Sequence, residues 1–255
     1  MACALVAGRQ RVTLMSAILL AALAAIGFTG ASLLALFGRG LSAKGRSYTA
    51  AIAAGILLAL AFVDLFPEGL ELAVEPAITG FIGGFTLLFL TEVFTHAHTH
   101  PSPGERVHKH ALGPFILGLA VHNFADGFVL GVGEEVSAIT SGLLGLGILV
   151  HQVPVGLSLA AVLTAAHATR AQVLLTAVLL GLVIPLASAL TVILPVSGEG
   201  PLGFLNGIAG GVLAYIGAAH LLPEAQTEYS SRVTGVLFAA ALVVATIGLM
   251  FISSG

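Results

Sequence analysis

The chain has 255 residues, of which 58% are hydrophobic and only 8% are charged. A water-soluble domain of this length needs a far larger share of charged residues on its surface, so the composition excludes a soluble globular protein and predicts an integral membrane protein. The formal net charge of −3 gives no reason to expect a nucleic acid as partner, and the single cysteine, Cys3, excludes an internal disulfide and a cysteine-based metal site.

Eight apolar segments are each long enough to cross a bilayer as a helix, which takes about 20 residues. The first could pass for a signal peptide, but its apolar run is long enough to span, and we interpret it as a retained helix. Segments of alternating hydrophobicity do not recur, so a membrane β-barrel is not expected. The sequence therefore predicts an all-α integral membrane protein with one transmembrane domain over residues 1–255, whose helices lie at roughly 13–37, 49–70, 76–95, 111–133, 138–165, 171–194, 201–222 and 233–253.

Basic residues gather on every second connection between these helices. The connections after the first, third, fifth and seventh helices hold most of the nine lysines and arginines, whereas those after the second, fourth and sixth helices carry glutamates instead. Because cytoplasmic loops are enriched in lysine and arginine, we expect the basic connections in the cytoplasm and both termini outside, in a plasma (inner) membrane. The basic residues concerned are Arg39, Lys44, Arg46, Arg106, Lys109, Arg170 and Arg232.

The second and seventh helices share a motif in which a proline and a glutamate follow an ionisable residue. The second helix reads DLFPEGLE (64–71) and the seventh reads HLLPEAQTE (220–228). Since the two helices run in opposite directions, the motif indicates an inverted repeat, helices one to three against six to eight, around a hairpin of helices four and five. Polar side chains would then mark a path across the membrane, with Asp64 and Glu68 toward the outside and His220 and Glu224 toward the inside.

The connection between the third and fourth helices is rich in histidine. It reads THAHTHPSPGERVHKH and ends at position 110. Short histidine-rich tracts are typical of metal binding, so we expect a cytoplasmic metal-binding loop over residues 96–110. Its histidines are His96, His98, His100, His108 and His110.

Helices four and five carry the second repeated motif, HNFADG (122–127) and HQVPVG (151–156). His122 and Asp126 are one helical turn apart on one face, and His151 lies at a depth that differs from that of His122 by only about 3 Å. Adjacent antiparallel helices can therefore bring these three side chains together, with Asn123 and Gln152 beside them. The closing glycines would let helices approach closely enough for the ligands to meet.

An ionisable side chain at the bilayer centre costs about 3 kcal/mol or more and normally faces a partner or a water-filled path. Two imidazoles and one carboxylate form a ligand set that suits a divalent transition metal. The alternative is a structural hydrogen-bond network that ties two helices together. The repetition of the motif favours the metal site.

These residues resemble the ZIP (Zrt/Irt-like) family of divalent metal transporters over nearly the whole chain. In that family helix four reads close to H-N-x-P-E-G, which HNFADG (122–127) matches except at Ala125 and Asp126. Helix five often reads [H/Q]-[E/N/D]-x-P-E-G, which HQVPVG (151–156) matches except at Gln152 and Val155. Helices two and seven commonly carry H-x-x-P-E, which the seventh helix matches in full and the second with an aspartate in place of histidine.

The resemblance implies a transporter that moves a divalent ion, zinc above all, toward the cytoplasm. Fe²⁺, Mn²⁺, Co²⁺ and Cd²⁺ are further substrates to consider, and no organic cofactor is expected. Some family members hold two adjacent metals bridged by a helix-five glutamate. Val155 cannot bridge, so we predict one transported metal, with Asn123 and Gln152 in weak or water-mediated contact with it. The expected partners are metal ions and lipid, and a homodimer is left open.

Two other functions stay open at this stage. Three protein ligands and a water make up a catalytic zinc site, so an intramembrane zinc hydrolase is the alternative from another class. Such an enzyme needs a general base besides the ligands, and the midplane offers no spare carboxylate unless Asp64 reaches it. A metal sensor or structural scaffold would use the histidine-rich loop but leaves the polar path unexplained. We expect a transporter and not an enzyme.

Overall fold

The computed structural model describes residues 2–37, 42–96, 112–133, 138–191, 193–194 and 198–253. These residues form helices and turns, with no strand among them, so the all-α fold is confirmed. In the described part, seven helices are long and apolar enough to cross a membrane, and a shorter apolar stretch, Ile148–Thr164, belongs to another helix. The histidine-rich loop lies outside the described residues, apart from His96 at the end of its helix.

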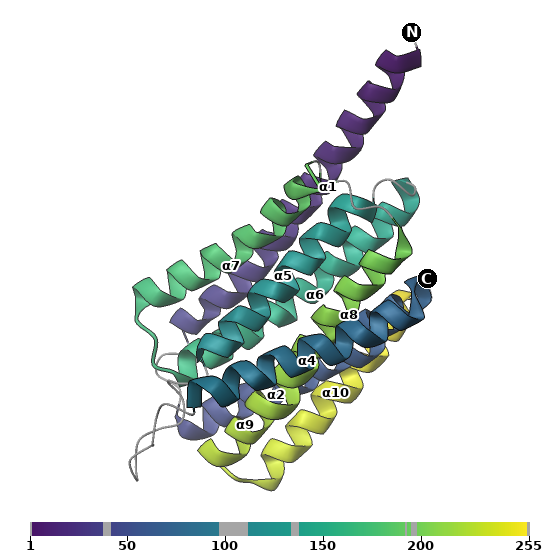
Figure 1. Ribbon diagram of the computed structural model, residues 1–255. Helices are drawn as coiled ribbons and strands as arrows, with labels where there is room; N and C mark the ends of the chain where they lie inside the picture. The colour runs from purple at the N-terminus through teal and green to yellow at the C-terminus, as the bar shows by residue number, and fades with distance from the viewer. Residues whose placement is uncertain are drawn as a thin grey trace.

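The helices run back and forth along the bundle (Figure 1). Three of the long rods are not continuous α-helices, because a 3-10 turn or a π turn, labelled η, interrupts or ends them. In chain order the elements are α1 (Ala2–Ser32), η1 (Leu33–Leu36), α2 (Ala43–Ala59), η3 (Leu60–Leu65), α3 (Phe66–Leu72), α4 (Val74–His96), α5 (Leu112–Gly133), α6 (Ala138–Ala165), α7 (Arg170–Leu190), α8 (Glu199–Tyr215), η5 (Ile216–Leu221), α9 (Leu222–Glu228) and α10 (Arg232–Ser253).

The two π turns, η3 and η5, have the same local cause. A proline follows each turn at the second residue of the next helix, Pro67 in α3 and Pro223 in α9. Proline lacks an N–H and its ring collides with the carbonyl four residues earlier, so a regular α-helix cannot continue through it unchanged. The wider turn absorbs the conflict, and the N–H groups of Phe66 and Leu222 each donate to the carbonyl five residues back.

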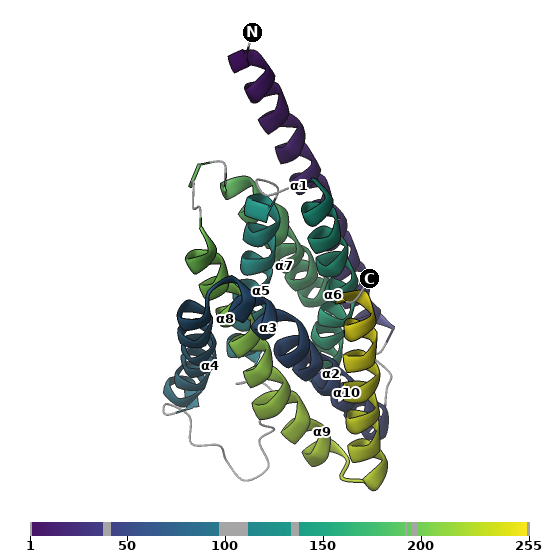
Figure 2. The same cartoon turned by 90° about the vertical axis from the view of Figure 1, so that its right-hand side faces the viewer.

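The long helices form two groups. α1, α5, α6 and α7 pack on one another, and α2, α4, α8 and α10 form the second group, while α5 against α8 and α2 against α6 join the two (Figures 1 and 2). Glycine allows the closest approach within the second group, because a Cβ at Gly80 or Gly207 would overlap a backbone carbonyl of the facing helix. Small residues at helix interfaces are typical of membrane bundles, where close packing rather than hydrophobic burial drives association.

The beginning of α2 is held against the end of α9. Arg46 forms an ion pair with Glu228, and both side chains are largely buried. Beside them the Ser47 hydroxyl donates to the carbonyl of Ala225 at 2.7 Å. These contacts hold α2 against the end of the α8–η5–α9 rod.

The ends of the helices lie at different heights along the bundle. Both chain termini lie at the same end (Figure 1), where α1 extends well beyond the other helices. The turn between α3 and α4 lies lower in the bundle than the facing ends of α5 and α6 (Figures 1 and 2). A residue near the end of α3 can therefore lie level with the middle of α6.

Candidate metal centre

The two repeated motifs lie on α5 and α6. Their closing glycines, Gly127 and Gly156, were expected to bring α5 and α6 close to each other, but they allow a close approach to other helices instead. A Cβ at Gly127 would overlap the carbonyl of Ile184 in α7, and a Cβ at Gly156 would overlap the carbonyl of Phe28 in α1. The glycines thus seat α5 on α7 and α6 on α1. They do not form the contact between α5 and α6 themselves.

His122, Asp126 and His151 meet in the interior of the bundle. The Asp126 Oδ2 atom lies 2.7 Å from Nε2 of His151 and 3.4 Å from Nε2 of His122. One ligand atom from each residue lies within 4.8 Å of the others. All three side chains are buried, with 0% of His122 and 3% of His151 exposed. Two imidazoles and a carboxylate at such separations can close around one divalent cation.

The His122 ring strengthens this interpretation. Both of its nitrogens are buried and have no hydrogen-bond partner among the described residues. A buried polar group without a partner is costly, so native proteins rarely leave one. A cation on Nε2 would satisfy that nitrogen.

Asn123 and Gln152 direct their amide donors to the protein. Asn123 Nδ2 donates to the Leu180 carbonyl of α7 at 2.8 Å. Gln152 Nε2 donates to Asp126 Oδ2 at 2.7 Å, with a longer contact of 3.5 Å to Asn123 Oδ1. The two amides therefore form a chain of hydrogen bonds that ends on the carboxylate at the centre.

Val155 is fully buried beside this chain. It offers no ligand atom where the family often has a glutamate. Gln152 donates a neutral N–H group to the Asp126 carboxylate. Asp126 therefore has two histidines of metal-ligand type next to it and, beside them, an amide that directs its donor to the carboxylate.

Asp64 and Glu68, expected toward the outer end of the path, lie near the centre. Asp64 Oδ2 is 3.4 Å from Nδ1 of His151. Glu68 is half-buried one turn further along and interacts electrostatically with Asp64, Asp126 and His151. The sequence places Asp64 near the outer membrane surface if all helices end at the same height. The α3–α4 turn lies lower than the ends of α5 and α6, so Asp64 lies deeper in the bundle than that count suggests (Figure 2).

Among the described residues, His220 and Glu224 are not part of the cluster of His122, Asp126 and His151. Nε2 of His220 is 3.4 Å from Oε2 of Glu92 in α4, and Glu92 also accepts a hydrogen bond from the Tyr215 hydroxyl. The ring of Tyr215 meets that of His220 edge to face, with centroids 5.5 Å apart. Glu224 is half-buried in α9, one turn beyond His220.

The sequence interpretation missed Glu92 and Asn206. Glu92 is the only carboxylate in the span expected at 76–95, and that isolation was the signal that could have identified it. Asn206 is a buried amide in α8 that interacts with Glu68 across the helix interface. Its only sequence signal is a polar residue within an apolar segment.

The comparison with known families decides the class of protein. A family model described as ZIP zinc transporter matches residues 114–254, which is more than half of the chain. The chain belongs to the ZIP zinc transporter family. As a ZIP protein with several membrane-length helices it is an integral membrane metal transporter, and the matched residues include α6 and α8 with all their polar side chains. No curated protein matched the chain closely enough to count as a relative.

Proposed function

We propose that this ZIP protein carries a divalent metal ion, zinc above all, toward the cytoplasm through a centre held by His122, Asp126 and His151. The observation that supports this most is the convergence of three buried ligand atoms within 4.8 Å of one another. Neutral imidazole and carboxylate are ligands that zinc prefers, and Fe²⁺, Mn²⁺, Co²⁺ and Cd²⁺ accept the same donors.

The centre holds one transported ion at a time. Val155 offers no ligand, and the Gln152 amide lies on the carboxylate that a second metal would have to share. Asn123 and Gln152 make at most weak or water-mediated contact with the ion. Their main role is to hold Asp126 in position, since Gln152 donates to the Oδ2 atom of Asp126 that also faces the two histidines.

The path is lined by polar side chains on both sides of the centre. Asp64 and Glu68 attract the cation from the outside, and two extra carboxylates near the centre balance the charge of a bound M²⁺. On the inside the ion passes His220 and Glu224 and reaches the histidine-rich loop, residues 96–110. The whole chain, residues 1–255, works as one transport domain.

An inverted repeat of helices one to three and six to eight is supported by the way the helices pack. α1 packs on α6 as α7 packs on α5, and α10 packs on α2 as α4 packs on α8. The π turns η3 and η5 are counterparts as well. Alternating access then arises when α5, α6 and their neighbours move against the repeat-related helices.

The orientation follows from the positive-inside distribution of lysine and arginine. Both termini lie outside, the histidine-rich loop is cytoplasmic, and the protein resides in the plasma (inner) membrane. A homodimer is compatible with this arrangement.

The test is zinc uptake into proteoliposomes by the wild type, His122→Ala and His151→Ala. Partners outside the ligand shell alone are worth about 10–100-fold, so loss of a ligand should reduce uptake by about 100-fold or more. His167→Asn is the matched control, since this exposed histidine lies between α6 and α7, away from the centre. Uptake that survives both alanine substitutions contradicts the proposal.

Substrate choice and direction are measured in the same vesicles. Competition by Fe²⁺, Mn²⁺, Co²⁺ and Cd²⁺ ranks the ions, and vesicles of known orientation separate inward from outward transport. We expect zinc to compete best and net movement toward the side that carries the basic loops.

The hydrolase alternative gains no support from the family, which consists of transporters. The nearness of Asp64 to His151 supplies a carboxylate that could act as a base, but the family match and the paired polar clusters favour transport. The sensor or scaffold alternative likewise has no observation in its favour.

A further inference from the structure

We propose that Asp64 orients His151 by accepting a hydrogen bond from its Nδ1–H group while Nε2 holds the metal. This inference rests on the proposed function, because it assigns Asp64 a role through a ligand of the transport site. Asp64 would thus be a positioning residue and not only an outer attractor for cations.

The His151 ring has one nitrogen at the centre and one facing away from it. Nε2 lies 2.7 Å from Asp126, whereas Nδ1 is buried and has no hydrogen-bond partner in the described part of the chain. A neutral imidazole carries one N–H donor and one lone pair. When Nε2 gives its lone pair to the metal, the proton must be on Nδ1, and that N–H needs an acceptor.

Asp64 is the carboxylate next to that nitrogen. Its Oδ2 atom lies 3.4 Å from Nδ1, slightly longer than a normal hydrogen bond, so a small rotation of either side chain closes the contact. Metal-bound histidines almost always donate their other N–H to a carboxylate, carbonyl or water, which fixes the ring and raises its basicity. At His151 the Nδ1–H group is the donor, the Asp64 carboxylate is the acceptor, and the two face each other.

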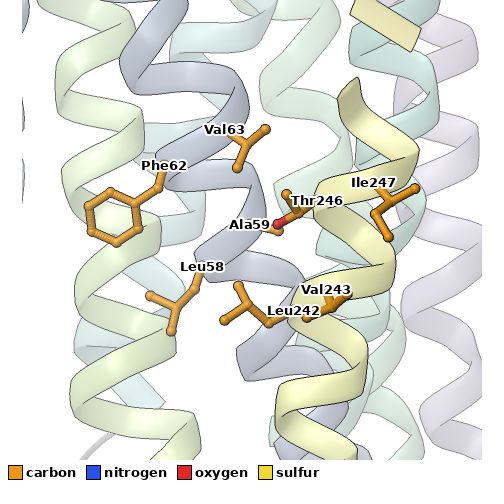
Figure 3. Close-up of a pocket in the computed structure, with 8 residues that line it drawn as sticks. All are labelled: Leu58, Ala59, Phe62, Val63, Leu242, Val243, Thr246 and Ile247. Carbon is orange, nitrogen blue, oxygen red and sulfur yellow. The ribbon is translucent and has the colours of Figure 1, made fainter. Parts of the chain in front are cut away.

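Within η3, the residues just before Asp64 face α10, whereas Asp64 faces α6 and His151. Phe62 and Val63 line a groove of about 500 Å³ between η3 and α10, apolar except for Thr246 (Figure 3). The neighbouring carboxylate is turned the other way, toward α6. About a third of the Asp64 side chain is exposed, against 3% for Asp126, so Asp64 is less enclosed than the central carboxylate.

The contact also crosses between the two helix groups. Asp64 belongs to the rod that contains α2 and packs with α8 and α10, whereas His151 belongs to α6, which packs on α1. The orientation of one metal ligand therefore depends on how the two groups sit against each other. Movement of one group would loosen His151 and weaken the grip on the ion.

The test is zinc affinity of full-length protein in detergent micelles, with a competing chelator as the reference. All variants carry serine at the five loop histidines, His96, His98, His100, His108 and His110, so that binding reports the helical centre. Asp64→Ala should weaken zinc binding by about 10–100-fold, as expected for a lost outer-shell carboxylate. Asp64→Asn keeps an acceptor oxygen for Nδ1–H, so its loss should be clearly smaller than that of the alanine variant.

X-ray absorption at the zinc edge separates positioning from ligation. If Asp64 acts through His151, the number of nitrogen and oxygen ligands stays the same in wild type and Asp64→Asn. A loss of one oxygen ligand would make Asp64 a direct ligand and overturn the inference. Glu71→Ala, an exposed carboxylate of α3, is the matched control and should bind like the wild type.

His122→Ala separates this inference from the proposed function. If the wild type binds zinc, His122→Ala loses it and Asp64→Ala binds normally, only the role of Asp64 is wrong. Equal losses in the alanine and asparagine variants also overturn it, because they indicate that charge rather than hydrogen bonding matters. If His122→Ala binds zinc as well as the wild type, the proposed centre is wrong and this inference with it.

Discussion

Each half of the chain contains a π turn with one ionisable side chain, a carboxylate in the first half and a histidine in the second. η3 and η5 each precede a proline by the same number of residues, and each holds one ionisable side chain at its fifth position, Asp64 and His220. In both cases a carboxylate oxygen lies 3.4 Å from a histidine nitrogen, Asp64 against His151 and Glu92 against His220. The π turn thus supplies the carboxylate in one half and the histidine in the other.

The difference lies in what surrounds each pair. At η5 the Tyr215 hydroxyl donates to Glu92, so the acid already has a neutral partner. At η3 the pair extends to Asp126 and to His122, whose ring nitrogens have no hydrogen-bond partner among the described residues. The same backbone turn therefore carries different side-chain clusters in the two halves. The side chains that meet each π turn decide which cluster forms there: Asp64 faces a histidine of the central cluster, and His220 faces a glutamate that a tyrosine also contacts.

The largest expected effect comes from breaking the η3 side at its centre with Asp126→Ala. The carboxylate is buried, accepts a hydrogen bond from Gln152 and lies 2.7 Å from Nε2 of His151, so its loss leaves these two buried side chains without that partner. We expect the loss of zinc uptake and a destabilisation of about 3–5 kcal/mol. Glu92→Ala is the counterpart in the other half, and its effect on thermal unfolding in detergent should be smaller. Equal losses of stability would show that the two pairs are alike.

The next effect tests whether the halves share their packing. Gly127→Ala and Gly156→Ala each place a methyl group against a backbone carbonyl of a facing helix. Overpacking of this kind costs about 1–3 kcal/mol, so both variants should unfold at lower temperature. Gly83→Ala is the control, since a methyl group there meets nothing within 4 Å. If only one of the two glycine variants is strongly destabilised, α5 and α6 do not depend on their facing helices in the same way.

A smaller effect separates the two π turns. In Pro67→Ala the conflict that widens η3 is gone, so the turn can tighten and rotate Asp64 away from His151. Zinc affinity should fall by about tenfold, at the lower limit for loss of an outer-shell partner. Pro223→Ala changes the same feature at η5 and should leave affinity at the centre unchanged. Equal losses in both variants would mean that the prolines act through general stability.

The smallest effect concerns the η5 pair. Glu92→Gln keeps a carbonyl oxygen for the Tyr215 hydroxyl but removes the charge that faces His220. Zinc uptake should fall by only a few-fold, in line with the modest net worth of one hydrogen bond or ion pair, about 1 kcal/mol. A complete loss of uptake would make this cluster equal in importance to the centre.

Much of the fold follows from the sequence because a bilayer demands long apolar helices, and such segments are visible in the chain. The meeting of His122, Asp126 and His151 was predictable as well, since one turn of helix and a short hairpin connect them. The position of Asp64 was not, because its depth depends on how low the α3–α4 turn lies (Figure 2). Nor were the partners of Gly127 and Gly156, because sequence adjacency favours α5 against α6 and the observed contacts are with α7 and α1.

The contact between the start of α2 and the end of α9 has a consequence for how the helices can move. Arg46, Ser47 and their partners join the start of one rod to the end of the other, and η3 and η5 lie further along these same rods. Because these contacts join the two rods, we expect a tilt of α2 to move α9 with it. We therefore expect Asp64 and His220 to move together when either rod tilts during transport.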